Sequence, residues 1–463
     1  MALNKIYNPG EVEKKWFKFW DDNDQFSSYP NDKKPYTIVI PPPNVTGILH
    51  MGHMLNNTIQ DILIRKARME GKEACWIPGT DHASIATETK VVEMLKEKGI
   101  DKQDISREEF LTHAWDWKEK YGGIIIEQLK RLGCSCDWER ERFTMDEGYT
   151  KAVLSAFVKL YEKGYIYKGF RLVNWCPVSK SAISDEEVIH KEKNGSLWYF
   201  RYLIKGSSES VVVATTRPET MLGDTAVAVN PDDERYKHLV GKDIILPIVG
   251  REIPLIADKY VDPKFGTGCV KVTPAHDPND FQMGERHDLE LINIMNDDAS
   301  MNSNVPDKYV GLSREKARKE VVEDIQKKGF LEKIENYQTK IGFSERGQVP
   351  IEFYLSEQWF MKMEHLVKPA IDAVNKGKIN FYPKHWSKTY NHWLLNIKDW
   401  CISRQLYWGH QIPVWYHKED KSRIHVSVNG PSDSENWVQD PDVLDTWASS
   451  WIWPMGVHKW PDQ

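Results

Sequence analysis

The sequence lacks several features that would assign it to a common class of protein. It has six cysteines in 463 residues, and only Cys134 and Cys136 lie close together, which argues against a disulfide-stabilised secreted fold and predicts reduced thiols in the cytoplasm. No apolar run approaches the roughly 20 residues of a membrane-spanning helix, and the first residues show no signal-peptide core. Basic residues number 62 against 68 acidic ones, so a nucleic-acid partner would have to bind local patches rather than an overall basic surface.

Common nucleotide and metal motifs are also missing. There is no glycine-rich loop of the Walker type and no Gly-x-Gly-x-x-Gly fingerprint, so a bound nucleotide would have to be held by other residues. Neither Cys-x-x-Cys nor His-Glu-x-x-His occurs, which leaves no complete zinc pattern.

A strand, a helix and a second strand follow one another near the N-terminus. The β-branched run at 36–40 ends at Pro41–Pro43, because proline has no amide proton for a central strand to donate. A helical pattern then covers about 52–70 and ends at Gly71, and the run at 73–78 is typical of a second strand. This order predicts a βαβ unit with a parallel sheet, whose ligands bind beyond the carboxyl ends of the strands.

Two further helices are marked by residue spacing. Val12, Trp16 and Trp20 repeat every four residues, which predicts a short amphipathic helix whose apolar stripe packs on the core. Ser106 and Glu109 form a capping-box pattern that opens a long helix.

The chain changes character twice and so divides into three parts. At about 150 residues per domain, its length corresponds to about three domains. Residues 1–194 are mainly helical, 195–345 consist of short β-rich runs between turns, and 346–463 return to aromatic-rich mixed structure. The predicted fold class is α/β, with a parallel-sheet domain that is interrupted by a β-rich inserted domain and then resumed.

A pair of histidines lies where the loop after the first strand enters the helix. His50 and His53 are one helical turn apart, so their rings point to one side, and Gly52 leaves room for a flat ligand. Unpaired amide protons at a helix start attract phosphates, and two imidazoles there suit a reaction in which pyrophosphate leaves an α-phosphate. The alternatives are a helix-entry pair without chemistry, or half of a metal site.

The motifs around this pair resemble those of a known family. PPPNVTGILHMGH is similar to the ATP-binding signature of class I aminoacyl-tRNA synthetases, in the form that valyl enzymes carry. PGTDHA at 78–83 resembles the family's amino-acid-binding motif, and the Trp-Asp-Cys-His string of isoleucyl relatives is absent. Residues 400–415 and 442–451 resemble the segments that return the chain to the Rossmann-like catalytic domain. The resemblance covers essentially the whole chain.

The resemblance implies ligation of valine to tRNA(Val) with ATP and Mg²⁺, by a monomeric cytoplasmic enzyme. Asp81 would pair with the α-ammonium of valine, because a cation in a closed pocket needs a carboxylate. Trp447 would form a wall of the side-chain pocket, although core packing is the alternative for each tryptophan taken singly. The residues implied for ATP are His50, Gly52 and His53, and those implied for valine are Pro42, Asn44, Asp81 and Trp447.

A second group of motifs lies in the β-rich insert. The hydroxyls and guanidinium of TTRPET at 215–220 suit a ribose ester and its phosphate, or else form a turn before a helix. The segment 266–280 ends in two carboxylates before a helix expected near Phe281, and such carboxylates can also be plain helix caps. Together these motifs resemble the editing (CP1) domain of valyl, isoleucyl and leucyl synthetases, in which water hydrolyses a wrong aminoacyl ester. The residues implied for editing of threonyl-tRNA(Val) are Thr215, Arg217, Thr220, Lys271, Asp277 and Asp280.

Two departures from the family pattern leave other functions open. The zinc-knuckle position has Cys176 but Ser179 where many relatives carry a second cysteine, so no zinc is predicted. The family's second ATP signature, Lys-Met-Ser-Lys-Ser, and an anticodon-binding domain do not occur, which predicts a fragment truncated before that motif. The chain could then be a hydrolase in which only the insert acts, or an inactive paralogue that binds tRNA or a nucleotide.

Overall fold

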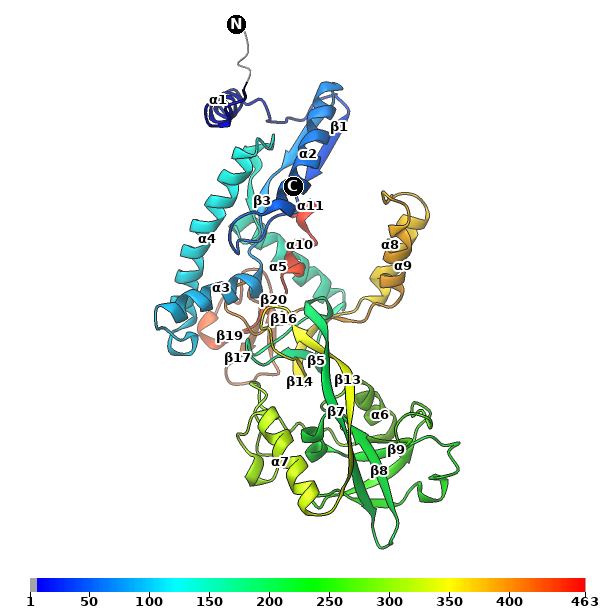
Figure 1. The fold of residues 1–463 in the computed structure, drawn as a ribbon. Helices are drawn as coiled ribbons and strands as arrows, with labels where there is room; N and C mark the ends of the chain where they lie inside the picture. Colours follow the sequence, from blue (N-terminus) through cyan, green and yellow to red (C-terminus); the bar gives the residue numbers. More distant parts are fainter. Residues whose placement is uncertain (1–5, 463) are drawn as a thin grey trace. The chain divides into compact units, whose positions relative to one another are not determined.

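The computed structural model describes residues 6–462, which form two compact units (Figure 1). Unit 2 is the continuous segment Lys168–Trp359, and unit 1 contains the chain on both sides of it. The predicted insert, 195–345, lies inside unit 2, which extends beyond it at both ends. At the N-terminal end the extension includes the first residues of the long strand β7 (Val188–Ile204), which pairs antiparallel with β13 (Leu331–Ser344) as far as Val188.

The predicted βαβ unit is confirmed in unit 1. Strands β1 (Pro35–Val39) and β2 (Glu73–Ile77) pair in parallel on either side of helix α2 (Met51–Met69). Gly71 follows the helix with φ +76°, a conformation that suits glycine. Consequently, the loop after β1 and the start of α2 lie beyond the carboxyl end of the sheet, where ligands of such folds bind.

The helices of unit 1 mostly follow their predicted signals. Ser106 Oγ accepts the N–H of Glu109 at 3.2 Å, as its capping pattern predicted. The predicted burial of the first helix was wrong, because α1 has no buried residue and Trp16 is 43% exposed. Phe17 and Trp20 contact rings outside the helix, Trp138 and Phe26, whereas Trp16 contacts rings of α1 itself. The other helices of unit 1 are α3 (Ser84–Glu97), η1 (Lys102–Asp104), α4 (Arg107–Arg131), η2 (Trp138–Arg140), α5 (Glu147–Glu162), α8 (Glu364–Asn375), α9 (Trp386–Leu395), η7 (Ser434–Asn436), α10 (Trp447–Ser450) and α11 (Trp453–Gly456).

Short strands complete unit 1. Strand β3 (Gly79–Thr80) pairs in parallel with β4 (Arg142–Phe143), just beyond β2. The remaining strands pair antiparallel as β16–β20 and as β18–β17–β19, apart from β15, which pairs antiparallel with β14 (Glu352–Met361). They are β15 (Trp400–Cys401), β16 (Ser403–Arg404), β17 (Val414–His417), β18 (Ile424–Val426), β19 (Trp437–Gln439) and β20 (Val443–Leu444). The chain leaves unit 1 along β5 (Ile166–Cys176) and returns along β14 (Glu352–Met361).

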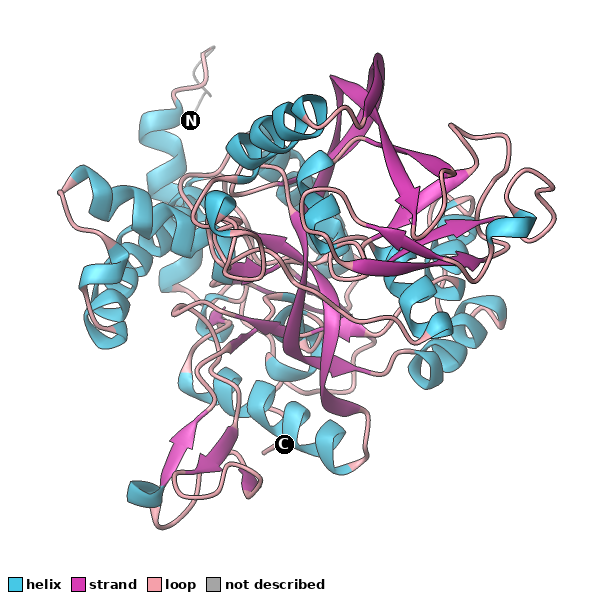
Figure 2. Ribbon diagram, turned by 90° about the horizontal axis from the view of Figure 1, so that it is seen from below, coloured by secondary structure: helices cyan, strands magenta, loops and turns pink. Residues whose placement is uncertain are grey.

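Unit 2 is built around a mixed sheet, visible among the strands of Figure 2. Its strand order is β12–β9–β11–β10–β7–β13, and β8 also pairs with β7. All four residues of β9 are buried, as expected for a strand covered on both faces. The elements not yet named are β6 (Ser181–Ala182), η3 (Asp185–Glu187), β8 (Ser210–Thr215), η4 (Pro218–Gly223), β9 (Ala226–Val229), η5 (Lys237–Leu239), β10 (Asp243–Ile245), β11 (Glu252–Ala257), β12 (Cys269–Val272), α6 (Pro278–His287), η6 (Asp307–Tyr309) and α7 (Arg314–Lys327).

One predicted helix start in unit 2 was wrong. Helix α6 begins at Pro278 and not near Phe281, because Asp277 caps it and proline is well suited to the first helical turn. Asp280 therefore lies on the helix rather than in a loop. Across residues 6–462, no helix combines the length and the apolar character that crossing a membrane would require.

Candidate functional site

The predicted histidine pair caps helix α2. Nδ1 of His50 accepts the backbone N–H of Gly52 at 3.1 Å, and Nδ1 of His53 accepts the N–H of His50 at 3.2 Å. The two ring centroids are 4.0 Å apart. Because both Nδ1 atoms accept, each ring in its neutral form carries its proton on Nε2. Burial, followed by the nearby His50, lowers the pKa of His53 and favours that neutral form.

Gly52 is the residue that permits this arrangement. An ideal Cβ at this position would lie 2.9 Å from Cε1 of His50, so a larger residue would displace the ring. His50 and Gly52 are exposed, and the helix start adds the positive end of the helix dipole. Two Nε2–H donors beside such a helix end suit the phosphates of a nucleotide.

Asp81 and Asn44 lie side by side beyond the carboxyl ends of β1 and β2. An isolated parallel bridge joins the two residues, and the N–H of Val45 donates to the Asp81 carbonyl at 3.0 Å. Pro42, in the same loop, is half-buried. Asp81 is 4% exposed, and burial raises the pKa of its carboxyl. The sheet therefore brings together three of the residues that the sequence indicated for an amino acid.

Neutral donors hold the Asp81 carboxylate. Ser450 Oγ donates to Oδ2 at 2.7 Å, and the N–H of Ala83 donates to Oδ1 at 2.8 Å. Thr144 Oγ1 lies 3.4 Å from Oδ1 and 2.7 Å from Nδ1 of His82. Burial lowers the pKa of His82 to about 3, so this ring is uncharged at neutral pH. A buried carboxylate without a cation among these contacts suits a cationic ligand.

Helix α10 reaches this carboxylate through a residue that the sequence analysis did not name. Ser450 is 369 positions from Asp81, and no local pattern marks such a partner. Trp447, at the start of the same helix, has been predicted as a pocket wall. Its side chain is 62% exposed here, so it does not close the pocket in this structure.

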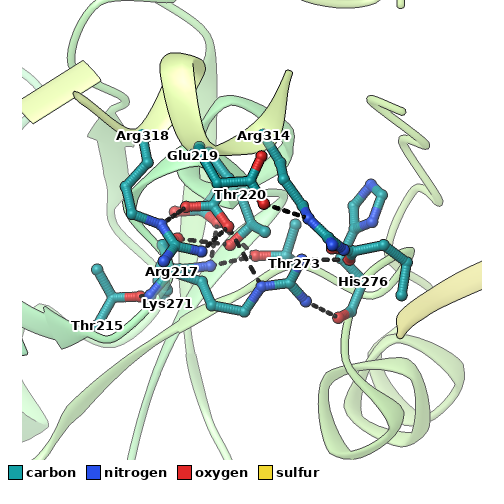
Figure 3. Close-up of polar contacts among 12 residues, drawn as sticks. Thr215, Arg217, Glu219, Thr220, Lys271, Thr273, His276, Arg314 and Arg318 are labelled. Carbon is teal, nitrogen blue, oxygen red and sulfur yellow. Dashed lines mark hydrogen bonds and ion pairs between the residues drawn. The ribbon is translucent and has the colours of Figure 1, made fainter. Parts of the chain in front are cut away.

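The second site lies in unit 2, where Lys271 and Thr273 meet a buried carboxylate (Figure 3). Nζ of Lys271 lies 3.2 Å from Oδ1 of Asp224 and 2.5 Å from Oγ1 of Thr273. The Thr273 hydroxyl donates to the same Asp224 oxygen at 2.6 Å, and the Tyr202 hydroxyl donates to the other at 2.8 Å. Asp224, which the sequence analysis missed, thus orients both the ammonium and the hydroxyl.

Asp280 is linked to this group through the backbone. Its Oδ2 accepts the N–H of Thr273 at 2.8 Å, and the residue is 8% exposed. Burial, followed by the charge of Asp277, raises the pKa of Asp280 to about 7. Asp277 itself accepts the N–H groups of Asn279 and Asp280 at 2.8 and 3.2 Å, which is the capping role that the sequence left as an alternative.

Arg217 is occupied by groups of its own unit (Figure 3). Nη1 donates to the carbonyl of His276 at 3.2 Å, Nε lies 3.4 Å from Oε1 of Glu219, and Nη2 pairs with Glu352. The N–H groups of this guanidinium are therefore used within the protein. Arg217 fixes the neighbouring groups of the site rather than binding a ligand directly.

Glu219 and Glu352, the two carboxylates that contact Arg217, also pair with arginines of helix α7 and form a charged network that is mostly buried. Glu219 is fully buried and accepts from Nε and Nη2 of Arg318 at 2.7 and 2.8 Å. Glu352 also accepts from Nη1 of Arg314 at 2.6 Å. Helix α7, which carries both arginines, is thereby tied to η4 and to the start of β14.

The two predicted threonines make local contacts. Oγ1 of Thr215 accepts the N–H of Arg217 at 3.0 Å, and Oγ1 of Thr220 donates to the Arg217 carbonyl at 2.9 Å. These contacts form the turn that the sequence left as an alternative for TTRPET. Figure 3 shows Thr215, Arg217, Thr220 and Lys271 in one cluster, so the fold gathers residues that lie about 50 positions apart in the chain.

The described residues offer no metal centre. Within 6–462, no three His, Cys, Asp or Glu side chains gather as a metal group would require, and Cys176 is a buried free thiol. The absence of zinc stays a prediction, and no side chain is assigned as a ligand of Mg²⁺.

Comparison with known proteins places the chain in a family. Residues 15–430 match the model of the tRNA synthetases class I (I, L, M and V), and the chain belongs to this family. It is similar to the valine–tRNA ligase of Parabacteroides distasonis, with 55% identity over 99% of this chain and 54% of that protein. The valine–tRNA ligase of Bacillus licheniformis is 54% identical over 100% of this chain and 52% of its own length. The chain thus spans about half the length of the relatives it matches.

Among solved structures, one similar protein is the agnB2 LeuRS of Agrobacterium radiobacter K84, determined in a ternary complex with tRNA and LeuAMS. It has 17% identity and a TM-score of 0.48, over 98% of this chain and 61% of that one.

Proposed function

We propose that the chain is the part of a valine–tRNA ligase that activates valine in unit 1 and removes wrongly attached threonine in unit 2. The observation that carries the proposal is the 55% identity with valine–tRNA ligases over 99% of the chain. It is supported by the geometry of two separate sites, each assembled within one unit.

In unit 1, the carboxylate of valine attacks the α-phosphorus of ATP, and pyrophosphate leaves as valyl-adenylate forms. His50 and His53 donate from Nε2 to phosphate oxygens, which stabilises negative charge as the bond to pyrophosphate breaks. Asp81 binds the α-ammonium and orients the amino acid, because its buried carboxylate has only neutral donors around it. Transfer of the valyl group to the 3′ end of tRNA(Val) follows, with release of AMP.

A second site is needed because valine and threonine have nearly the same shape. An apolar pocket cannot strongly reject an added hydroxyl, and the general value for valyl enzymes as a class is a discrimination of about a hundredfold. A polar pocket can instead bind threonine in preference to valine. A buried group that pairs with the threonine hydroxyl is left unpaired when valine binds, at a cost of roughly 1–3 kcal/mol.

In unit 2, water attacks the carbonyl carbon of the threonyl ester. The bond from this carbon to the ribose oxygen breaks, the ribose oxygen takes a proton, and the free amino acid leaves. Asp280 in its ionised form binds the substrate ammonium, and Lys271, already oriented by Asp224, directs a remaining N–H toward the ester. Arg217, Thr215 and Thr220 hold the surrounding turn, and Asp277 caps the helix that presents Asp280.

Hydrolysis of aminoacyl-tRNA by the protein tests the proposed role of unit 2. Threonyl-tRNA(Val) and valyl-tRNA(Val) are incubated at saturating concentration with the wild type and with Asp280→Ala. We expect rapid hydrolysis of the threonyl ester alone, and loss of most of this activity in the variant. Equal rates for the two esters, or an unimpaired variant, would overturn the assignment of unit 2.

Valine-dependent ATP–pyrophosphate exchange tests unit 1. In a protein of the relatives' full length that contains this chain, His53→Ala should slow exchange by about 10²-fold, the usual size for loss of a transition-state charge contact. Deacylation without exchange in the unmodified full-length protein would favour a hydrolase, and the absence of both would favour an inactive paralogue.

A further inference from the structure

The ring of His82 takes no part in the proposed reaction, although it follows Asp81 directly in the sequence. Strands β3 and β4 pair in parallel and end at Thr80 and Phe143. The next residues, Asp81 and Thr144, therefore lie side by side beyond one edge of the sheet, and the N–H of Thr144 donates to the Thr80 carbonyl at 3.2 Å. His82 and Thr144 are both 0% exposed.

The turn after Asp81 places the His82 ring between two buried hydroxyls. Ala83 has φ +49°, a left-handed conformation that alanine rarely adopts, and its N–H donates to Oδ1 of Asp81 at 2.8 Å. Helix α3 then starts at Ser84. Oγ1 of Thr144 lies 2.7 Å from Nδ1 of the ring, and Oγ of Ser84 lies 2.9 Å from Nε2. Each ring nitrogen thus faces one hydroxyl.

The contacts of the Thr144 hydroxyl indicate which ring nitrogen carries the proton. Burial keeps His82 uncharged, with its pKa lowered to about 3, so the ring has a single N–H. Oγ1 of Thr144 accepts the backbone N–H of His82 at 2.9 Å and has one proton to donate. If this proton points to Nδ1, it does not reach Oδ1 of Asp81, which is 3.4 Å from Oγ1. If Nδ1 carries the ring proton and donates to Oγ1, all three contacts of the hydroxyl are satisfied.

The Asp81 carboxylate favours the same position of the proton. Its Oδ1 lies 3.4 Å from Nδ1 of His82, and a carboxylate oxygen attracts an N–H but repels the lone pair of a bare nitrogen. On the other side of the ring, the Ser84 hydroxyl can donate to the bare Nε2. The arrangement is the opposite of that in His50 and His53, whose Nδ1 atoms accept backbone N–H groups.

We propose that His82 carries its proton on Nδ1 and is the centre of a directed hydrogen-bond chain that ends at the Asp81 carboxylate. The chain begins at the Ser84 hydroxyl and passes through the ring and the Thr144 hydroxyl. Because every donor points toward the carboxylate, the bonds polarise one another and offset part of the cost of burying its negative charge. His82 and Thr144 are therefore positioning residues that act on the amino acid through Asp81.

The role in amino-acid binding rests on the proposed function, whereas the position of the proton does not. A purely structural role is the alternative, because the same contacts join the end of β4 to the start of α3. The two roles differ in what they predict for the ring proton and for the binding of valine.

Nitrogen-15 NMR of the 463-residue chain, labelled at histidine, reads the ring proton directly. In a neutral ring, the protonated nitrogen resonates well upfield of the bare one. The signals of His82, assigned by their loss in His82→Gln, should show the proton on Nδ1, and those of His53 should show it on Nε2. Asp81→Ala removes the acceptor at the end of the chain and should shift His82 toward the form with the proton on Nε2.

Valine-dependent ATP–pyrophosphate exchange, in a protein of the relatives' full length that contains this chain, tests the positioning role. Thr144→Val keeps the shape of the side chain and removes its hydroxyl. It should raise the KM for valine by about tenfold, the lower end of the effect of one hydrogen bond to a charged group, with a smaller change in kcat. Thr144→Ser, which restores the hydroxyl, should recover most of the loss.

Thr87 provides the matched control. It lies on α3, is 0% exposed, and its Oγ1 has no hydrogen-bond partner among the residues that the structure describes. Thr87→Val therefore makes the same substitution in an equally buried position outside the chain, and it should leave the KM for valine unchanged. Thermal unfolding of each variant checks that the fold is kept.

Two outcomes would overturn the inference. One is a His82 ring with its proton on Nε2, which would reverse the direction of the chain. The other is a KM for valine that Thr144→Val and Thr87→Val change equally, which would leave only the structural role. A full-length protein without exchange, whose His82 nevertheless carries its proton on Nδ1, would contradict the proposed function and confirm the chain.

Discussion

The ammonium of Lys271 lies 3.2 Å from Oδ1 of Asp224, and both residues are buried. The same carboxylate receives the hydroxyl protons of Thr273 and Tyr202, so four polar groups are held in one geometry. Asp224 touches no ligand in the proposed reaction. It is a positioning residue that decides where the ammonium and the hydroxyl point.

Replacing Asp224 by Asn should therefore reduce deacylation of threonyl-tRNA(Val) by about 10- to 100-fold, since a small misplacement of reacting groups has effects of this size. We expect the loss in kcat more than in KM, because Asp280 still binds the substrate ammonium. Steady-state kinetics measure the split. Asp243→Asn, on an exposed strand residue of the same unit, is the matched control and should behave as the wild type.

The pH dependence of deacylation should report the ionisation of Asp280. Its pKa is raised to about 7 by burial and by Asp277, so the carboxylate that binds an ammonium is lost as pH falls through 7. The kcat/KM for deacylation, corrected for spontaneous ester hydrolysis, should therefore increase as the pH increases through about 7. Asp277→Asn should move the midpoint to lower pH, because a neighbouring negative charge has been removed. A midpoint that stays in place would contradict this electrostatic account.

The raised pKa of Asp280 also predicts how the stability of the folded protein changes with pH. Asp280 has a pKa near 7 when folded and an ordinary value of 3.8. Between about pH 4 and pH 7 the folded state therefore holds more protons than the unfolded one, and this residue makes the fold less stable as pH rises through that window. Denaturation at pH 5 and pH 7.5 should show a smaller loss of stability in Asp280→Asn than in the wild type.

Glu219→Gln should destabilise unit 2 by about 3 kcal/mol, because Arg318 and Arg217 lose a partner that is fully buried. Hydrogen exchange of the amides in η4 and α7 measures the change locally. Glu315→Gln is the control: its side chain is 63% exposed where it pairs with Arg314, so its removal should cost at most about 1 kcal/mol. Similar effects of the two variants would show that burial is not the deciding factor.

Gly52→Ala should separate stability from nucleotide binding. Alanine favours a helix by up to about 1 kcal/mol over glycine, whereas displacement of the His50 ring removes a capping hydrogen bond of similar size, so the net stability should change little. The new Cβ would nevertheless collide with Cε1 of His50 and displace the ring, so the affinity for ATP should fall by about tenfold, as judged by equilibrium binding. Gly123→Ala, in a helix position with open space around it, should leave the affinity unchanged.

The sequence by itself determined the local elements and indicated part of the residues that the fold brings together at each candidate site. The end of β1, the start of α2 and the opening of α4 depend on residues within a few positions of one another, and short-range hydrogen bonds and helical spacing decide them. The same reasoning failed where a contact at long range was needed, as for the α1 stripe, because periodicity shows that a face is apolar but not what covers it.

Tertiary structure alone decided which groups surround the buried charges. Ser450 reaches Asp81 across 369 positions, Asp224 reaches Lys271 across 47, and Glu352 ties up Arg217 across 135. A buried charge must have hydrogen-bonding or charged partners, but many residues of the chain could supply them. Only the packing of the completed fold selects one partner among them, and that selection determines whether a side chain is held in place by the protein or left available to a ligand.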